Sequence, residues 1–146
     1  MRRISFFAIA IFSVIIFMSR AEAAPRKNPV TNHWYDIVAS DPGAQNFWLD
    51  AELKARALGG HLASISSVEE KDWVYLNFVN GTNRNYWIGL NDMDIEGGLS
   101  WSDGEPVAYT NWHAAWRNTD GRDYAFIRQS DAGWDMGYKY DYRLGV

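Results

Sequence analysis

The chain contains eight tryptophans, eight tyrosines and seven phenylalanines but no cysteine. Because no disulfide can form, the folded state has to be held together by packing, and aromatic side chains bury the largest apolar area per residue. Every tryptophan lies beyond residue 33. We therefore expect an aromatic core that is built from the chain downstream of residue 33.

The first 23 residues have the pattern of a secretory signal peptide. Arg2 and Arg3 precede an apolar run from Ile4 to Met18, and the small-residue pattern Ala21-Glu22-Ala23 follows it. A membrane anchor is the alternative, but a spanning helix needs about 20 apolar residues and this run is shorter. We predict cleavage after Ala23, which leaves a secreted or periplasmic protein without a membrane anchor. The lack of cysteines in a small exported chain favours a bacterial source.

The charge of the chain limits its partners. Its 146 residues carry 14 basic and 18 acidic side chains, and the leader accounts for three arginines and one glutamate, so the remaining 123 residues have a net charge of −6. That length fits one domain. Nucleic-acid binding needs clustered lysines and arginines that displace counterions from phosphates, and such a cluster is missing from the sequence. The negative charge excludes this class and is compatible with a bound cation.

The first half of this domain predicts a strand followed by two helices. After a polar N-terminal segment at 24–32, residues 33–38 are dense in aromatic and β-branched side chains, which favours a strand. Apolar residues at helical spacing predict a helix over 46–58, which Gly59-Gly60 ends. Ser67 and Glu70 have the spacing of a capping box and predict a second helix from 67 to about 79. The pattern leaves two alternatives for the residues that face inward: Trp73, Leu76 and Val79, or Tyr75 and Phe78.

The second half predicts strands around a long loop. Strands are expected at 86–90 and 124–128, with a return strand after Gly133 and a short last strand at 142–146. Roughly thirty residues between the first two strands are rich in Gly, Asp, Asn and Trp and have little periodicity. A loop of that length in a small domain is usually functional.

Five stretches along the chain, taken together and in order, resemble the C-type lectin-like family: residues 57–65, Trp87-Ile88-Gly89-Leu90-Asn91-Asp92, Trp101-Ser102-Asp103-Gly104, Tyr109-Thr110-Asn111-Trp112 and Gly133-Trp134-Asp135. The resemblance implies an α+β domain over residues 33–146, in which two helices flank small antiparallel sheets and the long loop carries the ligand site. It also implies core positions for Trp87, Gly89 and Leu90, and a structural turn position for His61. Ala55 and Tyr124 stand where the family usually has cysteines.

The same resemblance implies a calcium-bridged sugar site, but the residues at its positions lack the required oxygens. Where sugar-binding members have a Glu-Pro-Asn type of triplet this chain has Trp116, Arg117 and Asn118, and Arg122 replaces an acidic ligand. The later triplet reads Trp134-Asp135-Met136, and Met136 offers no oxygen to calcium. We predict that a ligand is bound without the usual calcium bridge, by these residues: Trp116, Arg117, Asn118, Arg122 and Asp135.

A second calcium site of the family, which steadies the loop without touching sugar, has better candidates. Asp92 and Glu96 lie four residues apart after the predicted strand, and Asp123 with Asn118 or Asp120 would complete a cage of oxygen ligands. The alternative is that these residues form an ordinary polar loop surface. Both interpretations stay open.

The sequence bears on three classes of function: carbohydrate binding, protein binding and catalysis. The first is a secreted carbohydrate-binding module, with loop aromatics such as Tyr109, Trp112 and Trp116 stacking on sugar rings, although a core position is favoured for Trp112. The second is a lectin-like domain that binds a cell-surface protein in adhesion or host interaction; a homo-oligomer would serve either class by raising avidity. Catalysis is not expected, because the sequence has only three histidines and neither a Gly-x-Ser-x-Gly motif nor a metal-hydrolase spacing.

Overall fold

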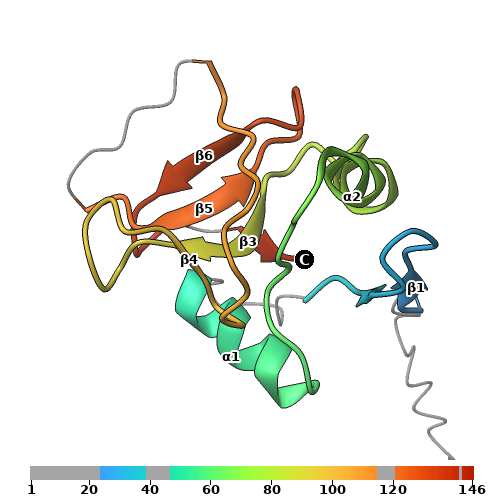
Figure 1. The fold of residues 1–146 in the computed structure, drawn as a ribbon, viewed down its shortest axis with the longest axis horizontal. Coiled ribbons are helices and arrows are strands. Elements are labelled where there is room, and N and C mark those ends of the chain that lie inside the picture. The colour runs from blue at the N-terminus through green and yellow to red at the C-terminus, as the bar shows by residue number, and fades with distance from the viewer. Residues whose placement is uncertain (1–23, 39–46, 115–120, 142) are drawn as a thin grey trace, which may run out of the picture.

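A computed structural model describes residues 24–38, 47–114, 121–141 and 143–146, and its central feature is a five-stranded sheet. Strand β3 (Tyr86–Asn91) pairs antiparallel with β4 (Ser100–Trp101) and β5 (Tyr124–Ile127), and β5 pairs with β6 (Trp134–Gly137). The last strand, β7 (Leu144–Gly145), runs parallel to β3. The sheet places β4 and β6 at opposite edges (Figure 1).

A small hairpin precedes this sheet. Strands β1 (Arg26–Lys27) and β2 (Trp34–Tyr35) pair with each other, so the segment predicted only as polar contributes a strand. The predicted strand at 33–38 is shorter than expected, but Val38 forms an isolated bridge to Gly145. The hairpin lies to one side of the domain, below α2 in Figure 1.

Helix α1 (Trp48–Ala57) confirms the predicted helix at 46–58 and packs closely on the sheet. Trp48 is buried and its Nε1 donates a hydrogen bond to the carbonyl oxygen of Ile88, 2.7 Å away. Ala51 is fully buried, and a Cβ on Gly145 would lie 3.3 Å from the Ala51 Cβ. Small residues on both elements therefore allow the helix to approach β7.

The second helix differs from its prediction in the residues that it buries. It consists of α2 (Val68–Val74), which continues as a π-helical turn, η1 (Tyr75–Val79). The wider turn shifts the inward face, so that Val74, Phe78 and Val79 are buried and Leu76 is 65% exposed. The predicted face of Tyr75 and Phe78 is borne out, because Phe78 is buried and Tyr75 packs partly buried against the core. The other predicted face is correct for Val79, partly correct for Trp73 and wrong for Leu76, since a regular α-helical repeat does not continue through the π-helical turn.

The capping box at the start of α2 is only half formed. The Ser67 hydroxyl accepts a hydrogen bond from the Glu70 amide at 3.2 Å, as predicted. The Glu70 carboxylate turns away from Ser67 and accepts hydrogen bonds from the Tyr35 hydroxyl and from the amide and hydroxyl of Ser66. Glu70 therefore ties the N-terminal hairpin to α2.

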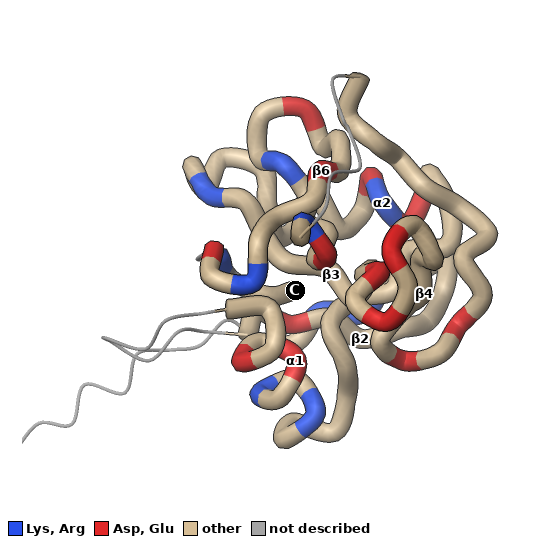
Figure 2. The backbone as a smooth tube through the Cα atoms, turned by 90° about the vertical axis from the view of Figure 1, so that its left-hand side faces the viewer, with Lys and Arg blue, Asp and Glu red and all other residues tan. Residues whose placement is uncertain are grey.

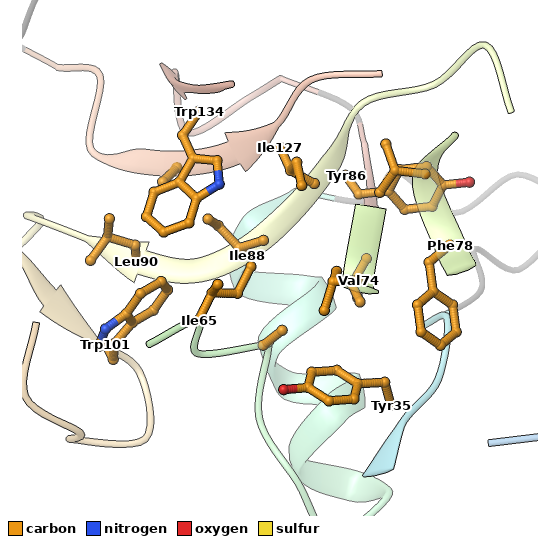
Figure 3. Packing of buried hydrophobic residues seen from close by; sticks show 14 of the residues in the cluster. Tyr35, Ile65, Val74, Phe78, Tyr86, Ile88, Leu90, Trp101, Ile127 and Trp134 are labelled. Carbon is orange, nitrogen blue, oxygen red and sulfur yellow. The ribbon is translucent and has the colours of Figure 1, made fainter. Parts of the chain in front are cut away.

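The core consists of two clusters of buried side chains. The larger cluster fills the space between the sheet, α2 and the hairpin (Figure 3). In the smaller cluster the rings of Trp48 and Tyr124 lie 5.0 Å apart, and Trp87 contacts Tyr124 and Phe126 edge-on. Tyr124 thus joins α1 to β5 by aromatic contact at a position where the resemblance implied a missing cysteine.

Gly89 occupies the core position that the resemblance implied. A Cβ at this residue would lie 2.6 Å from the carbonyl oxygen of Leu62 and 2.8 Å from the hydroxyl of Ser102. Both neighbours are therefore held against the β3 backbone, and the Gly89 amide also donates to the carbonyl of Ala63. β4 itself lies within the segment that the sequence predicted as a continuous loop.

Candidate functional site

Arg122 and Tyr138 lie next to each other, because Arg122 precedes β5 and Tyr138 follows the paired strand β6. The guanidinium carbon of Arg122 lies over the ring of Tyr138, 5.2 Å from its centroid, and Tyr138 is 47% exposed. A hydrogen bond that Arg122 donates to the Tyr138 side chain raises the pKa of Arg122, and the negative charges of Asp135 and Asp141 act in the same direction. The guanidinium is thus charged and held against the ring of Tyr138, a side chain that is about half exposed.

Asp135 lies on β6 and is already engaged by neighbouring groups. One of its carboxylate oxygens accepts from the Met136 amide at 2.9 Å, and the other lies 3.9 Å from the Arg128 guanidinium. The Met136 side chain is 2% exposed and contains no oxygen atom that a calcium ion needs. A divalent cation beside Asp135 would meet the positive charge of Arg128, so the residues present do not fit a sugar-bridging calcium.

Two aromatic residues of the long loop, Tyr109 and Trp112, pack against the core. The rings of Tyr109 and Trp112 contact the fully buried ring of Trp134 edge-on, at centroid distances of 5.6 and 6.1 Å. Both side chains are only partly accessible. Trp112 and Tyr109 therefore pack against the core without being fully buried, which agrees in part with the core position predicted for Trp112.

Two of the carboxylates predicted for the structural calcium site lie close together. The Asp92 amide donates to the carbonyl oxygen of Asp123 at 3.0 Å, and the Asp92 carboxylate accepts from the Gly97 amide at 2.9 Å. Burial raises the pKa of Asp123, and the negative charge of Asp92 raises it further. The predicted third carboxylate, Glu96, is exposed, and the described residues bring no group of three or more acidic or histidine side chains into a metal-binding arrangement.

Four of the predicted site residues, Trp116, Arg117, Asn118 and Asp120, lie outside the described residues. Of the others, the charge of Asp135 acts on Arg122, and the backbones of Asp92 and Asp123 are joined by a hydrogen bond. The structure also adds Tyr138, which sequence analysis missed. The signal was present in Tyr138-Lys139-Tyr140, where two tyrosines directly follow the predicted return strand; both are exposed, Tyr140 to 68%.

His61 has the structural role that the resemblance implied. Its Nδ1 lies 2.6 Å from a carboxylate oxygen of Glu52 in α1, and the other oxygen of Glu52 accepts from the Leu62 amide at 2.9 Å. Glu52 is 8% exposed. The pair fixes the turn after α1 to the helix itself.

Basic and acidic residues are mixed along the described part of the chain (Figure 2). Figure 2 shows Lys and Arg interspersed with Asp and Glu along the described backbone, without a continuous basic band. Within the described residues, no helix is long and apolar enough to cross a membrane.

Comparison with known proteins shows which family this fold and site represent. Residues 44–140 match the family profile described as Lectin C-type domain, so the chain belongs to the C-type lectin domain family. The fold prediction is confirmed with it. The family consists of binding modules, so the chain is a binding module rather than an enzyme.

Three relatives illustrate the range of the family. The chain is 33% identical to the mouse low affinity immunoglobulin epsilon Fc receptor over 96 residues, which cover 65% of the chain and 28% of the receptor. A mouse scavenger receptor C-type lectin carbohydrate-recognition domain is 28% identical, with a TM-score of 0.61 over 70% of this chain and 82% of that one. A calcium-independent type II antifreeze protein is 25% identical, with a TM-score of 0.62 over 77% of this chain and 95% of that one. The chain spans less than a third of the length of that curated receptor.

Proposed function

We propose that this chain is a secreted carbohydrate-binding module that contacts sugar directly through Arg122 and Tyr138, without a calcium ion between protein and sugar. The observation that carries this proposal is the Arg122 guanidinium over the half-exposed ring of Tyr138. An exposed aromatic face stacks on the apolar face of a sugar ring, and a guanidinium donates several hydrogen bonds to hydroxyl or carboxylate oxygens. Trp116, Arg117 and Asn118 are proposed to add contacts from the loop.

Two further observations support direct contact. Asp135 is paired with Arg128 and Met136 contributes no oxygen, so two positions of the calcium-bridged geometry are unsuited to the ion. Among the relatives, a carbohydrate-recognition domain shows that the fold binds sugar, and a calcium-independent antifreeze protein shows that the fold can serve a protein that needs no calcium.

Glycan-array binding in the presence of calcium and in the presence of chelator tests this proposal. We expect the same glycans to bind under both conditions, because no ion takes part in the contact. A set of glycans that binds only with calcium would contradict the proposal. Binding to none of the glycans would favour the second candidate, a protein or cell-surface receptor partner, which the similarity to an immunoglobulin receptor supports.

A calcium ion is proposed at a different place, between Asp92 and Asp123, where it would steady the loop after β3. The two like charges lie close together with partial burial, and a cation there would relieve their repulsion. Asp92 is 2% exposed, which also suits an ion held inside the loop. Glu96, Asn118 and Asp120 are the proposed additional ligands.

Thermal unfolding with and without calcium tests this second ion. An ion that binds only the folded protein at about ten times its Kd stabilises it by roughly 1.4 kcal/mol. For a domain of this size we expect the Tm to rise by a few degrees, about 3–6 °C, in millimolar calcium. Asp92→Asn should abolish the rise, whereas Asp94→Asn, an exposed neighbour on the same loop, should keep it. An unchanged Tm in the wild type would remove calcium from the account.

A further inference from the structure

A groove on the side of α1 carries features of a binding site and is separate from the Arg122–Tyr138 surface. Its volume is about 580 Å³, within the range of small-molecule sites. It lies between the β1–β2 hairpin, the end of α1, residues 61–64 and the turn that follows β4. The groove is lined by the turn that follows β4, whereas Arg122 precedes β5 and Tyr138 follows β6. Strands β4 and β6 are the opposite edges of the sheet (Figure 1).

The charged side chains that line the groove are carboxylates, and two histidines lie among them. Three carboxylates, Asp36, Asp103 and Glu105, line it together with His33 and His61. None of the described lining residues is a lysine or an arginine. Lys27, which pairs with Trp34 across the hairpin, is not part of the lining. The groove therefore presents a negative field to an entering ligand.

Two large apolar side chains in the lining are open to solvent. Trp34 is 66% exposed and Leu58 is 75% exposed. They come from different elements, the hairpin and the end of α1. An exposed indole next to carboxylates is an arrangement that attracts an organic cation, because the indole face and the carboxylates both favour positive charge.

The three carboxylates of the groove differ in how firmly neighbouring groups hold them. Asp103 accepts hydrogen bonds from the Ser64 hydroxyl at 2.5 Å and from the Glu105 amide at 3.0 Å, so it is fixed in place. One oxygen of Asp36 accepts from the Ile37 amide at 2.8 Å. The Glu105 side chain is exposed. Asp103 is thus positioned by its neighbours, and Glu105 is open to approach.

We propose that this groove binds an organic cation, with a protonated primary amine at Asp36, Asp103 and Glu105 and an apolar or sugar body against Trp34 and Leu58. The amine can belong to an amino sugar or to an aliphatic amine, since both present the same ammonium group. This site works independently of the proposed sugar contact at Arg122 and Tyr138.

Titrations followed by two-dimensional NMR test the proposal with three probes: a glucosamine trisaccharide, its fully N-acetylated form and cadaverine. We expect both amines to shift the Trp34 indole signal, identified with Trp34→Phe, and the acetylated sugar to leave it unchanged because acetylation removes the charge. A shift by only one of the two amines identifies the source of the ammonium group. Raising the NaCl concentration from about 20 mM to about 500 mM should weaken binding several-fold.

Charge-neutralising variants separate this groove from other acidic surfaces. Asp36→Asn combined with Glu105→Gln should weaken amine binding about five-fold or more, since two of the three carboxylates lose their charge. The matched control, Glu69→Gln combined with Asp94→Asn, removes the same charge from exposed positions outside the groove and should have no such effect. The proposal is overturned if neither amine binds, if the acetylated sugar binds equally well, or if the groove variant binds like the control. The glycan array tests the Arg122–Tyr138 surface, and its result does not affect any of these outcomes, which are measured at Trp34.

Discussion

Trp134→Ala should lower the free energy of unfolding by about 3–5 kcal/mol, which for a small domain is a large part of its total stability. The Trp134 side chain is fully buried, and three rings contact it edge-on: Trp101, Tyr109 and Trp112. The removed ring would leave a cavity that three anchored aromatic neighbours cannot readily close. Urea unfolding monitored by circular dichroism measures this loss of stability. A variant that is unfolded without urea would agree with the upper end of the predicted range.

Trp134→Phe is the matched control for this prediction. The Trp134 indole Nε1 is buried without a hydrogen-bond partner among the described residues, so phenylalanine removes an uncompensated polar group while it keeps an aromatic ring. We expect a loss of less than about 1.5 kcal/mol. If the alanine and phenylalanine variants lost equal stability, ring packing would not be the source of the Trp134 contribution.

Glu70→Gln should destabilise the fold by about 1.5–3 kcal/mol, because a charged acceptor of several buried hydrogen bonds is replaced by a neutral group with only one acceptor oxygen. Glu70 is 1% exposed and accepts from Tyr35 and from both donors of Ser66. The amide of a glutamine would place donors opposite donors there. Glu69→Gln, at the exposed neighbouring position, should change stability by less than about 0.5 kcal/mol.

The pH dependence of stability gives a second measurement on Glu70. Burial by itself would raise the pKa of Glu70, but the hydrogen bonds from Ser66 and Tyr35 outweigh it and the pKa lies below its usual value of 4.5. The stabilisation is therefore present above about pH 4.5 and is lost as the pH falls through the lower folded-state value. The stability difference between wild type and Glu70→Gln should shrink in that acid range, and a constant difference would contradict the assignment.

The sequence predicted the elements of the fold better than their details. Aromatic density, the spacing of Ala51 and Ala55, and the family motifs located α1, β3, β5 and β6 correctly. The buried face of the second helix was predicted only in part, because the π-helical turn η1 changes the spacing of the inward residues and a regular α-helical period does not describe it. The hairpin strand β1 was missed for a related reason, since its two residues pair with β2 but carry no β-strand pattern of their own.

The candidate site was predictable where a single residue type decides the chemistry. Met136 cannot supply an oxygen in any fold, and Arg122 carries its charge in any fold. What the sequence could not provide is which side chains meet across strands, such as Arg122 with Tyr138 and Arg128 with Asp135. Arg143 is a further example: its guanidinium lies over the rings of Phe126 and Trp87, at 3.7 and 4.5 Å from their centroids, and burial lowers its pKa.

Calorimetric titration in the presence of chelator, with a glycan selected from the array, tests the central claim most directly. The wild type should bind without calcium. Arg122→Ala and Tyr138→Ala should each weaken binding about ten-fold or more, which corresponds to roughly 1.4 kcal/mol. Arg84→Ala and Tyr140→Ala, which remove an exposed arginine and an exposed tyrosine elsewhere, should leave the Kd within about two-fold of the wild type. Binding that is absent in chelator and restored by calcium, or that survives both site variants, would contradict direct sugar contact at Arg122 and Tyr138.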